Sequence, residues 1–328
     1  MADIVTDNVE FKLLGLLQDG FPLTREPFSD IGVKLAITGD DVIRHINNLK
    51  LKGIVRQISP VLDARKIGYQ STLVAMKIPE QGIGKVESFL IGHPGVSHAY
   101  ERDNAYNIWF TLSLPMAVDI QTELKRISTN TGVESAFDLP AVKVFKLRTN
   151  FSHDKDNRSL EKTLNVNSMA EQIELSEIER NVINALQEDL PLSPNPFKKF
   201  ADKLGISVDS MLSICHLLLQ KGVIRRYGAS INHYKAGYMA NAMTCWYVPP
   251  EKMMTFVANV IALVQVSHCY ERKTNPSWHY NVFVMIHGYN SSACRNTINK
   301  ISSDNGINDL AILFSTKEFK KTRIKYPV

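Results

Sequence analysis

The sequence predicts an α+β protein built as a tandem duplication, in which each copy is a helix-turn-helix domain followed by a ferredoxin-like βαββαβ domain. Three observations predict it. Two long stretches repeat in the same order, each repeat opens with three short amphipathic helices, and each closes with strands and helices in the order βαββαβ. The 328 residues are too many for one ordinary domain. Because such sheets commonly pair, we expect the two copies to form an internal pseudo-dimer.

The duplication is visible as a series of matches at a nearly constant spacing. LTREPFSDIGVKLAIT is echoed by LSPNPFKKFADKLGIS, and KGIVR is echoed by KGVIR. Farther on, VSHAYER is echoed by VSHCYER, so that His98 matches His268, and the Tyr-Asn step at Tyr106 matches that at Tyr280. Chance could produce one such match but not the ordered series, so the chain contains two diverged copies of one module.

The repeat divides the chain into five segments. We expect helix-turn-helix domains over 1–62 and 177–231, ferredoxin-like domains over 63–150 and 232–328, and a linker over 151–176. The linker is polar and charged and has few aromatic residues, which is typical of a solvated connection.

Each helix-turn-helix domain is predicted from apolar residues at helical spacing and from helix caps. We expect helices over 8–18, 27–35, 177–187 and 196–204, and a third helix in each copy. Thr38 and Ser207 stand at the N-cap of the third helices, and a glycine closes each one. The segments GIVRQISPVLD and GVIRRYGASIN then suggest short strands or wings.

The rest of each copy alternates between strand and helix patterns. STLVAMKIP and NAMTCWYVP are strand-like and end at proline, and KVESFLIGHPG and MMTFVANVIAL are helical. VSHAYER and YNIWFTL predict a strand pair, as do VSHCYER and YNVFVMI. A further helix over 117–129 or 291–303 and a last strand complete the βαββαβ order in each copy.

Composition narrows the function without identifying it. The formal net charge of +5 is mild, so it permits an anionic partner but does not require one. No apolar run is long enough to cross a membrane, and the acidic start does not resemble a signal peptide. Four cysteines lie in the second half without a CxxC pair, so we expect no zinc ribbon and a reducing cytoplasmic setting.

The helix-turn-helix pattern raises a DNA-binding alternative, which the residues argue against. A recognition helix needs Arg, Lys, Asn or Gln near its N-terminus to reach bases and phosphates. The third helices instead begin with Asp40 and Asp41 in the first copy and Asp209 in the second, which would repel phosphates. We expect these helices to be scaffold and the chain to bind no DNA, with an effector-binding transcription regulator as the alternative function.

Two matching strands carry the residues that point to chemistry. Side chains alternate across a strand, so His98, Tyr100 and Arg102 share one face, as do the matching residues of the second copy, His268, Tyr270 and Arg272. Each of these residues alone has an ordinary structural explanation, such as a hydrogen-bonded histidine or a tyrosine with a wet hydroxyl. Their joint recurrence in both copies favours a functional role, in which these side chains form one wall of a binding pocket. Asn107 and Asn281 follow a tyrosine in a strand and are expected to fix a bulge.

A helix-turn-helix followed by βαββαβ resembles the Lrp/AsnC family of transcription regulators. HPGVSHAYERDNAYNIWFTL and VSHCYERKTNPSWHYNVFVMIHG are more similar to the siroheme decarboxylases, which keep that fold, and the chain resembles their fused two-subunit form. The resemblance covers nearly all of the chain except the linker. It implies a carbon–carbon lyase that removes two acetate carboxyl groups of siroheme as CO2, giving 12,18-didecarboxysiroheme for d1-type heme or for an alternative heme route. It implies no cofactor beyond the substrate with its iron.

The resemblance also assigns roles to the candidate residues. His268 and His98 are the expected proton donors, assisted by Tyr270 and Tyr100, and either histidine could instead be an axial ligand of the siroheme iron. Siroheme carries eight carboxylates, so cationic and polar side chains are expected to hold it. The candidates for substrate binding are Arg56, Arg225, Arg226, Arg102, Arg272, His279, Trp109, Lys146, Arg148, Lys320 and Arg323.

The two copies differ in these candidates. The first copy has Gln57 where the second has Arg226, and the second copy adds His279 and His287. We therefore expect the second copy to be the richer catalytic half, while a fused chain could use both halves, one for each acetate. The last strands add lysines, Lys321 among them, as further carboxylate-binding candidates. A tetrapyrrole carrier without catalysis is a third possible function, and further association of whole chains is left open.

Overall fold

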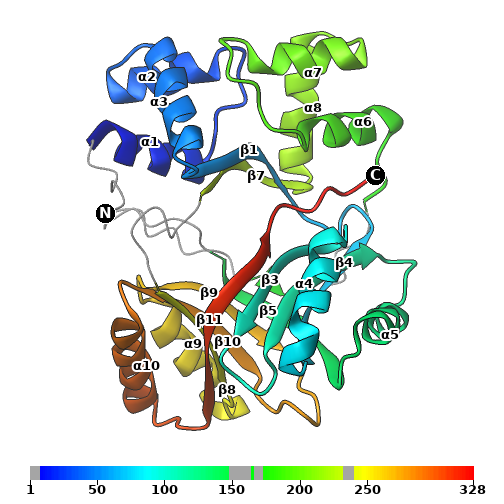
Figure 1. Cartoon of the computed structure of the whole chain (residues 1–328). Helices are drawn as coiled ribbons and strands as arrows, with labels where there is room; N and C mark the ends of the chain where they lie inside the picture. Colours follow the sequence, from blue (N-terminus) through cyan, green and yellow to red (C-terminus); the bar gives the residue numbers. More distant parts are fainter. Residues whose placement is uncertain (1–7, 148–163, 166–172, 232–239) are drawn as a thin grey trace.

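The computed structural model describes residues 8–147, 164–165, 173–231 and 240–328, and these form a helical layer and a sheet layer (Figure 1). Both layers contain elements of both copies. The tandem α+β architecture predicted from the repeat is confirmed.

The helical layer contains the helices expected for two helix-turn-helix units. They are α1 (Asn8–Asp19), α2 (Pro27–Leu35), α3 (Gly39–Leu51), α6 (Glu177–Leu186), α7 (Pro196–Leu204) and α8 (Val208–Gln220). The predicted caps are present, since the Thr38 and Ser207 side chains accept hydrogen bonds from the backbone N–H of Asp41 and Ser210 at 3.1 Å. Gly53 and Gly222, just after α3 and α8, have φ of 67° and 65°, a conformation that favours glycine.

The two helical units are joined into one body. Strand β1 (Val55–Leu62) of the first copy pairs antiparallel with β7 (Ile224–Ile231) of the second. Buried residues from all six helices form one continuous core, which also includes Leu175 at the end of the expected linker. The helical layer is therefore a single unit to which both copies contribute. Most of the expected linker lies outside the described residues.

The sheet layer follows the predicted βαββαβ order twice. The first copy contributes β2 (Tyr69–Lys77), α4 (Ile83–Gly92), β3 (Val96–Arg102), β4 (Ile108–Pro115), α5 (Ile120–Thr131) and β5 (Ser135–Leu147). The second contributes β8 (Ala240–Trp246), α9 (Met253–Ile261), β9 (Val266–Arg272), β10 (Val282–Gly288), α10 (Ser291–Asn305) and β11 (Leu310–Lys321). A short strand β6 (Leu164–Asn165) pairs with β5, and single 3-10 turns precede α4 and α9.

The last strand of each copy is shared between the two sheets. The first half of β11 pairs with β8 of its own copy, and the second half pairs with β3 of the other copy. In the same way, β5 pairs first with β2 and then with β9. The two four-stranded sheets are therefore joined along both edges, and the pairings close into a ring of eight strands.

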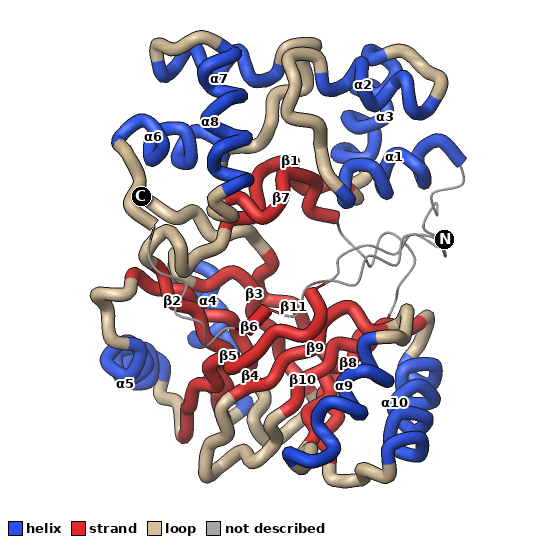
Figure 2. The backbone as a smooth tube through the Cα atoms, turned by 180° about the vertical axis from the view of Figure 1, so that it is seen from behind, coloured by secondary structure: helices blue, strands red, loops and turns tan. Residues whose placement is uncertain are grey.

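The closed arrangement has an inner core and two outer cores. Trp109, Phe137, Trp278 and Phe283 are among the inner-core residues that pack between the sheets. Helices α4 and α5 cover the outside of one sheet, and α9 and α10 cover the outside of the other (Figure 2). None of the described helices is long and apolar enough to span a bilayer.

The C-terminal tail runs from β11 back to the helical layer (Figure 1, red). The Arg323 guanidinium donates to the carbonyl oxygens of Ser59 at 2.6 Å and Gly228 at 3.2 Å, so it ties the tail to both β1 and β7. The Tyr326 ring packs edge-on against Tyr69 with ring centroids 4.9 Å apart. The tail therefore fixes the end of β11 relative to the helical layer.

Candidate functional site

The His-x-Tyr-x-Arg motifs lie on the inner face of the two sheets, with arginine deepest and histidine at the rim. On β3, Ala99 packs into the outer core under the helices, so its neighbours on the strand point the other way. At the rim, His98 is paired with Lys321 of β11. The Arg56 guanidinium of β1 donates to the Lys321 carbonyl oxygen at 2.6 Å, so this rim meets the helical layer.

The two motif arginines hold the copies together. Arg102 of the first copy donates to the Leu313 carbonyl oxygen of the second at 3.0 Å, and Arg272 of the second donates to the Leu139 carbonyl oxygen of the first at 2.7 Å. Each guanidinium also lies near its motif tyrosine, 5.3 Å from the Tyr100 ring centre and 4.8 Å from that of Tyr270. Burial lowers the pKa of Arg272. These contacts give both arginines a structural role in shaping the inner wall.

His98 is exposed at the rim and lies in a cationic setting. Its Nδ1 is 2.9 Å from the Ser97 hydroxyl oxygen. Desolvation by the surrounding protein, followed by the charges of Lys321 and Arg56, lowers the pKa of His98 to about 4. The imidazole of the unliganded chain is therefore neutral near neutral pH.

The second copy places two histidines on one serine. The Ser267 hydroxyl oxygen lies 2.7 Å from His268 Nδ1 and 2.7 Å from His287 Nε2. Burial, followed by the charge of Lys321, lowers the pKa of His287 to about 4. Lys321 thus influences histidines of both copies. We call His98, His268, His287, Lys321 and Arg56 the histidine site.

Each wing arginine is paired with a carboxylate. Arg56 Nη2 lies 3.4 Å from Glu318 of β11, and Arg225 Nη2 lies 2.9 Å from Asp63. Burial would raise the pKa of Asp63, but the charge and hydrogen bond of Arg225 hold it below its ordinary value. Arg225 also lies close enough to Tyr270 to oppose the increase in its pKa caused by burial. Both predicted wing arginines therefore stand near a motif strand.

Several predicted binding residues lie away from the histidine site. Lys320 donates to the carbonyl oxygen of His93 at 2.8 Å, after α4, and Lys146 donates to that of Ile261 at 2.7 Å, at the end of α9. Both lysines therefore cap helix C-termini on the outer face of the sheets. Arg323 binds the backbone of β1 and β7, as described above.

The remaining candidates are distributed as follows. Arg226 donates to the Gln18 carbonyl oxygen of α1. His279 is exposed and pairs with Asp309 at 2.9 Å. Trp109 is only 1% exposed and packs against Trp278 in the inner core, with ring centroids 5.1 Å apart. Arg148 lies outside the described residues. The geometry therefore brings Arg56, Lys321 and His98 together, with His287 within reach of the Lys321 charge, but it does not bring these residues there.

Sequence reasoning missed the serines that precede the motif histidines. Ser97 and Ser267 are buried and orient the two imidazoles. Their recurrence as VSH in both copies was the available signal. Asn107 and Asn281 connect neighbouring strand ends instead of facing the site. The Asn281 side chain donates a hydrogen bond to the Val248 carbonyl oxygen at 2.8 Å and accepts one from the Val248 N–H at 2.9 Å.

The N-termini of α3 and α8, the helices that a DNA-binding domain would place in the groove, are contacted by the opposite copy. Arg25 forms a two-pronged ion pair with Asp209 at the start of α8. At the start of α3, Pro194 of the second copy lines a small hollow with Thr38, Gly39 and Asp40. These helix ends therefore contact other parts of the same chain, and they carry carboxylates that would repel phosphate.

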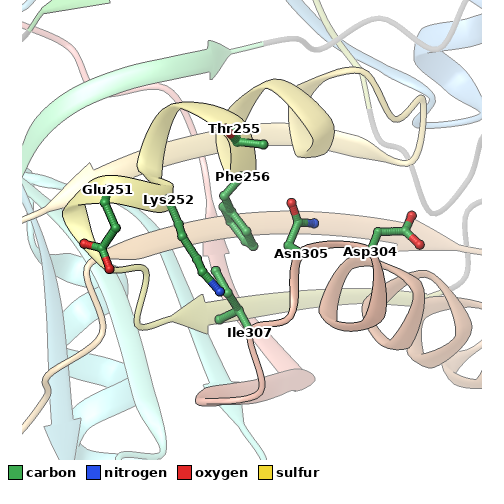
Figure 3. A pocket seen from close by; sticks show the side chains of 7 residues that line it. All are labelled: Glu251, Lys252, Thr255, Phe256, Asp304, Asn305 and Ile307. Carbon is green, nitrogen blue, oxygen red and sulfur yellow. The ribbon is translucent and has the colours of Figure 1, made fainter.

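A hollow between the helices that cover the outside of the second-copy sheet is too small for a tetrapyrrole. It lies between the start of α9 and the end of α10 and is lined by Lys252, Thr255, Asp304 and Asn305, among others (Figure 3). Its volume is about 210 Å³, below the roughly 300–1,000 Å³ of typical small-molecule sites. In the described part of the chain, no cluster of His, Cys, Asp or Glu is arranged to hold a metal ion.

Comparisons with known proteins cover both layers. Residues 10–56 and 179–225 match the family described as "Siroheme decarboxylase NirDL-like HTH domain", and residues 66–146 and 235–320 match "AsnC-like ligand binding domain". A siroheme decarboxylase from Hydrogenobacter thermophilus is 34% identical, over 96% of this chain and 94% of the relative. A siroheme decarboxylase beta subunit from Methanosarcina barkeri is 41% identical over 44% of this chain and 95% of its own length.

Solved structures agree with the sequence comparisons. A crystal structure of the siroheme decarboxylase NirDL in complex with an iron-uroporphyrin III analogue has a TM-score of 0.75 and 31% identity, and covers 98% of this chain and 95% of that one. The similarity therefore spans both tandem copies, as the fused-form resemblance predicted.

Proposed function

The chain belongs to the siroheme decarboxylase family, and on this premise we propose that it removes acetate carboxyl groups of siroheme as CO2. The observation that carries the proposal is the histidine site, where imidazoles from both copies meet cations from both layers. A ring that bears many carboxylates needs such cations, and the carbon that loses CO2 needs a nearby proton donor.

Each decarboxylation breaks the bond between the acetate methylene carbon and its carboxyl carbon. The electron pair passes into the conjugated macrocycle, so the reaction needs no cofactor beyond the substrate. A proton then returns to the methylene carbon and leaves a methyl group. Two such steps give 12,18-didecarboxysiroheme, which would classify the chain as a carboxy-lyase of d1-type heme or alternative heme synthesis.

His98 is the residue we propose as proton donor in the first copy. It is neutral in the unliganded chain because desolvation and the charges of Lys321 and Arg56 lower its pKa to about 4. Substrate carboxylates that pair with those two cations would remove their effect and add negative charge, and both changes raise the pKa of the imidazole. Substrate binding would thus protonate His98 and make it able to donate a proton. His268 stands at the matching position and is held by Ser267.

The structure supports the enzyme over the transcription-regulator alternative. The starts of α3 and α8 carry carboxylates and contact the opposite copy, and the arginines there, Arg25 and Arg44, are already paired with Asp209 and Asp41. The four cysteines are free and buried, which fits a reducing cytoplasmic setting.

Anaerobic incubation with siroheme, followed by mass measurement of the extracted tetrapyrrole, tests the function. Loss of two CO2 units is expected. Unchanged siroheme with a mobility shift on genomic fragments would favour the regulator, and siroheme that binds but keeps its mass would favour a carrier.

A further inference from the structure

Ser267 of the second copy bridges two imidazoles. Its hydroxyl oxygen lies 2.7 Å from His268 Nδ1 and 2.7 Å from His287 Nε2. Ser267 is only 4% exposed, whereas both histidines are half-buried. The hydroxyl is therefore shielded from water, and the three side chains form one hydrogen-bonded chain from β9 to β10.

A β-bulge brings these groups together. Ser267 is the extra residue in the ladder between β9 and β10, where the register shifts between Met285 and Ile286. A bulge re-aims side chains locally, and this one lets Ser267 meet the ring of the residue that follows it. His287, the next residue on β10, is fixed from the other side, because its backbone N–H donates to the Gln265 carbonyl oxygen at 2.9 Å.

The first copy has the same bulge but a different residue behind it. Ser97 is the extra residue in the ladder between β3 and β4, and its hydroxyl oxygen lies 2.9 Å from His98 Nδ1. Ser113 of β4 stands at the position that matches His287, and its hydroxyl donates to that of Ser71 at 2.9 Å. The serine that orients the motif histidine is thus common to both copies, whereas the second copy places a further imidazole behind it.

The chemistry of the three groups suits proton transfer. A hydroxyl has one hydrogen and two lone pairs, and a neutral imidazole has one N–H and one free ring nitrogen. The hydrogen bonds can therefore run in either direction along the chain, and a proton that enters at one ring can leave at the other. Burial, followed by the charge of Lys321, lowers the pKa of His287 to about 4, so this ring passes on an incoming proton readily.

We propose that Ser267 relays protons from His287 to His268. This inference rests on the proposed function, in which His268 protonates the methylene carbon. A hydronium ion protonates His287 at Nδ1. The Nε2–H bond of His287 then breaks as its proton moves to Ser267 Oγ, and the original Ser267 hydroxyl proton forms a new N–H bond at His268 Nδ1.

The relay ends with the transfer to carbon. The His268 imidazolium gives its Nε2 proton to the methylene carbon and returns to the neutral ring. Each step moves one proton, so nothing is oxidised or reduced. Because two carboxyl groups leave each ring, two protons are needed, and the relay can recharge His268 while the substrate is still bound.

Single-turnover decarboxylation at saturating siroheme, scored by the mass of the ring, tests the relay. His287→Gln is the informative variant, because the amide can still hold the Ser267 hydroxyl in place but cannot carry a proton. We expect His287→Gln and Ser267→Ala to slow the loss of CO2 about tenfold or more, with the Kd for siroheme little changed. Ser267→Thr keeps the hydroxyl and should keep most of the rate.

Added imidazole provides a second test, which does not depend on whether Ser267→Ala folds. It should accelerate decarboxylation by His287→Gly, because it replaces the missing ring. It should not accelerate Ser97→Ala, the matched variant of the first copy, from which no imidazole has been removed.

The outcomes separate this inference from the proposed function. A wild-type chain that releases no CO2 from siroheme contradicts the function. Normal turnover by wild type, together with a wild-type rate in His287→Gln, contradicts the relay alone and leaves Ser267 with an orienting role.

Discussion

Binding of a polyanionic ring at the histidine site should drive proton uptake by His98. The perturbation is the addition of iron-uroporphyrin, a carboxylate-rich ring, to the unliganded chain. With a pKa of about 4, roughly 1% of the His98 imidazole is protonated at pH 6. An opposite charge within a few ångströms raises such a pKa by about 1–3 units. The protonated fraction should therefore rise to roughly 10–90% on binding.

Isothermal titration calorimetry in buffers of different ionisation enthalpy measures this uptake directly. At pH 6 we expect roughly 0.1–0.9 proton per bound ring from His98. The pKa of His287 is also about 4 and also responds to Lys321, so His98→Asn and His287→Asn separate the two contributions. Uptake should fall most in His98→Asn. Zero uptake in wild type, or uptake unaffected by His98→Asn, would refute the charge coupling.

Three further predictions concern stability and the scaffold. Asn281→Ala should lower the free energy of unfolding by about 1–3 kcal/mol, because two hydrogen bonds to Val248 are lost; a denaturant titration that shows no change would contradict the bracing role. Lys320→Met should destabilise by about 1–2 kcal/mol through the lost carbonyl contacts, yet leave the Kd for siroheme unchanged; weakened binding in a folded variant would place Lys320 at the site. The pKa values of His98 and His287 are lowered from 6.5 to about 4 in the folded chain, so between these pH values the unfolded chain binds more protons than the folded one. Tm should therefore fall as the pH is lowered from 6.5 to 4, and it should fall less steeply in the double variant His98→Asn/His287→Asn. An equal dependence of Tm on pH in both proteins would contradict the lowered pKa values.

The local elements were predictable because each has a local cause. Caps at Thr38 and Ser207, apolar stripes and strand alternation fix the helices and the βαββαβ order within short windows. His98 lies on the same strand face as Tyr100 and Arg102 because side chains along a strand alternate with a period of two residues. The same reasoning applies to His268 and its matching residues. Such features depend on nearby residues only, so the repeat made each of them visible twice.

The pairing between copies was not predictable from those patterns. Strands β5 and β11 split their hydrogen bonds between two sheets, and only the tertiary arrangement decides which half pairs with which copy. That crossing places Lys321 beside His98 and turns Lys320, its neighbour in sequence, toward a helix end. A charge count on the last strand cannot separate these two lysines, because successive side chains point to opposite faces.

The central claim is that the histidine site donates the proton that completes decarboxylation. It is tested most directly by single-turnover incubation of siroheme with wild type and with His98→Asn and His268→Asn, scoring CO2 loss by the mass of the ring and binding by absorbance. We predict full loss of two carboxyl groups with wild type and a drop of about 100-fold or more in rate for at least one variant that still binds siroheme. Wild-type rates in both folded variants would contradict the account.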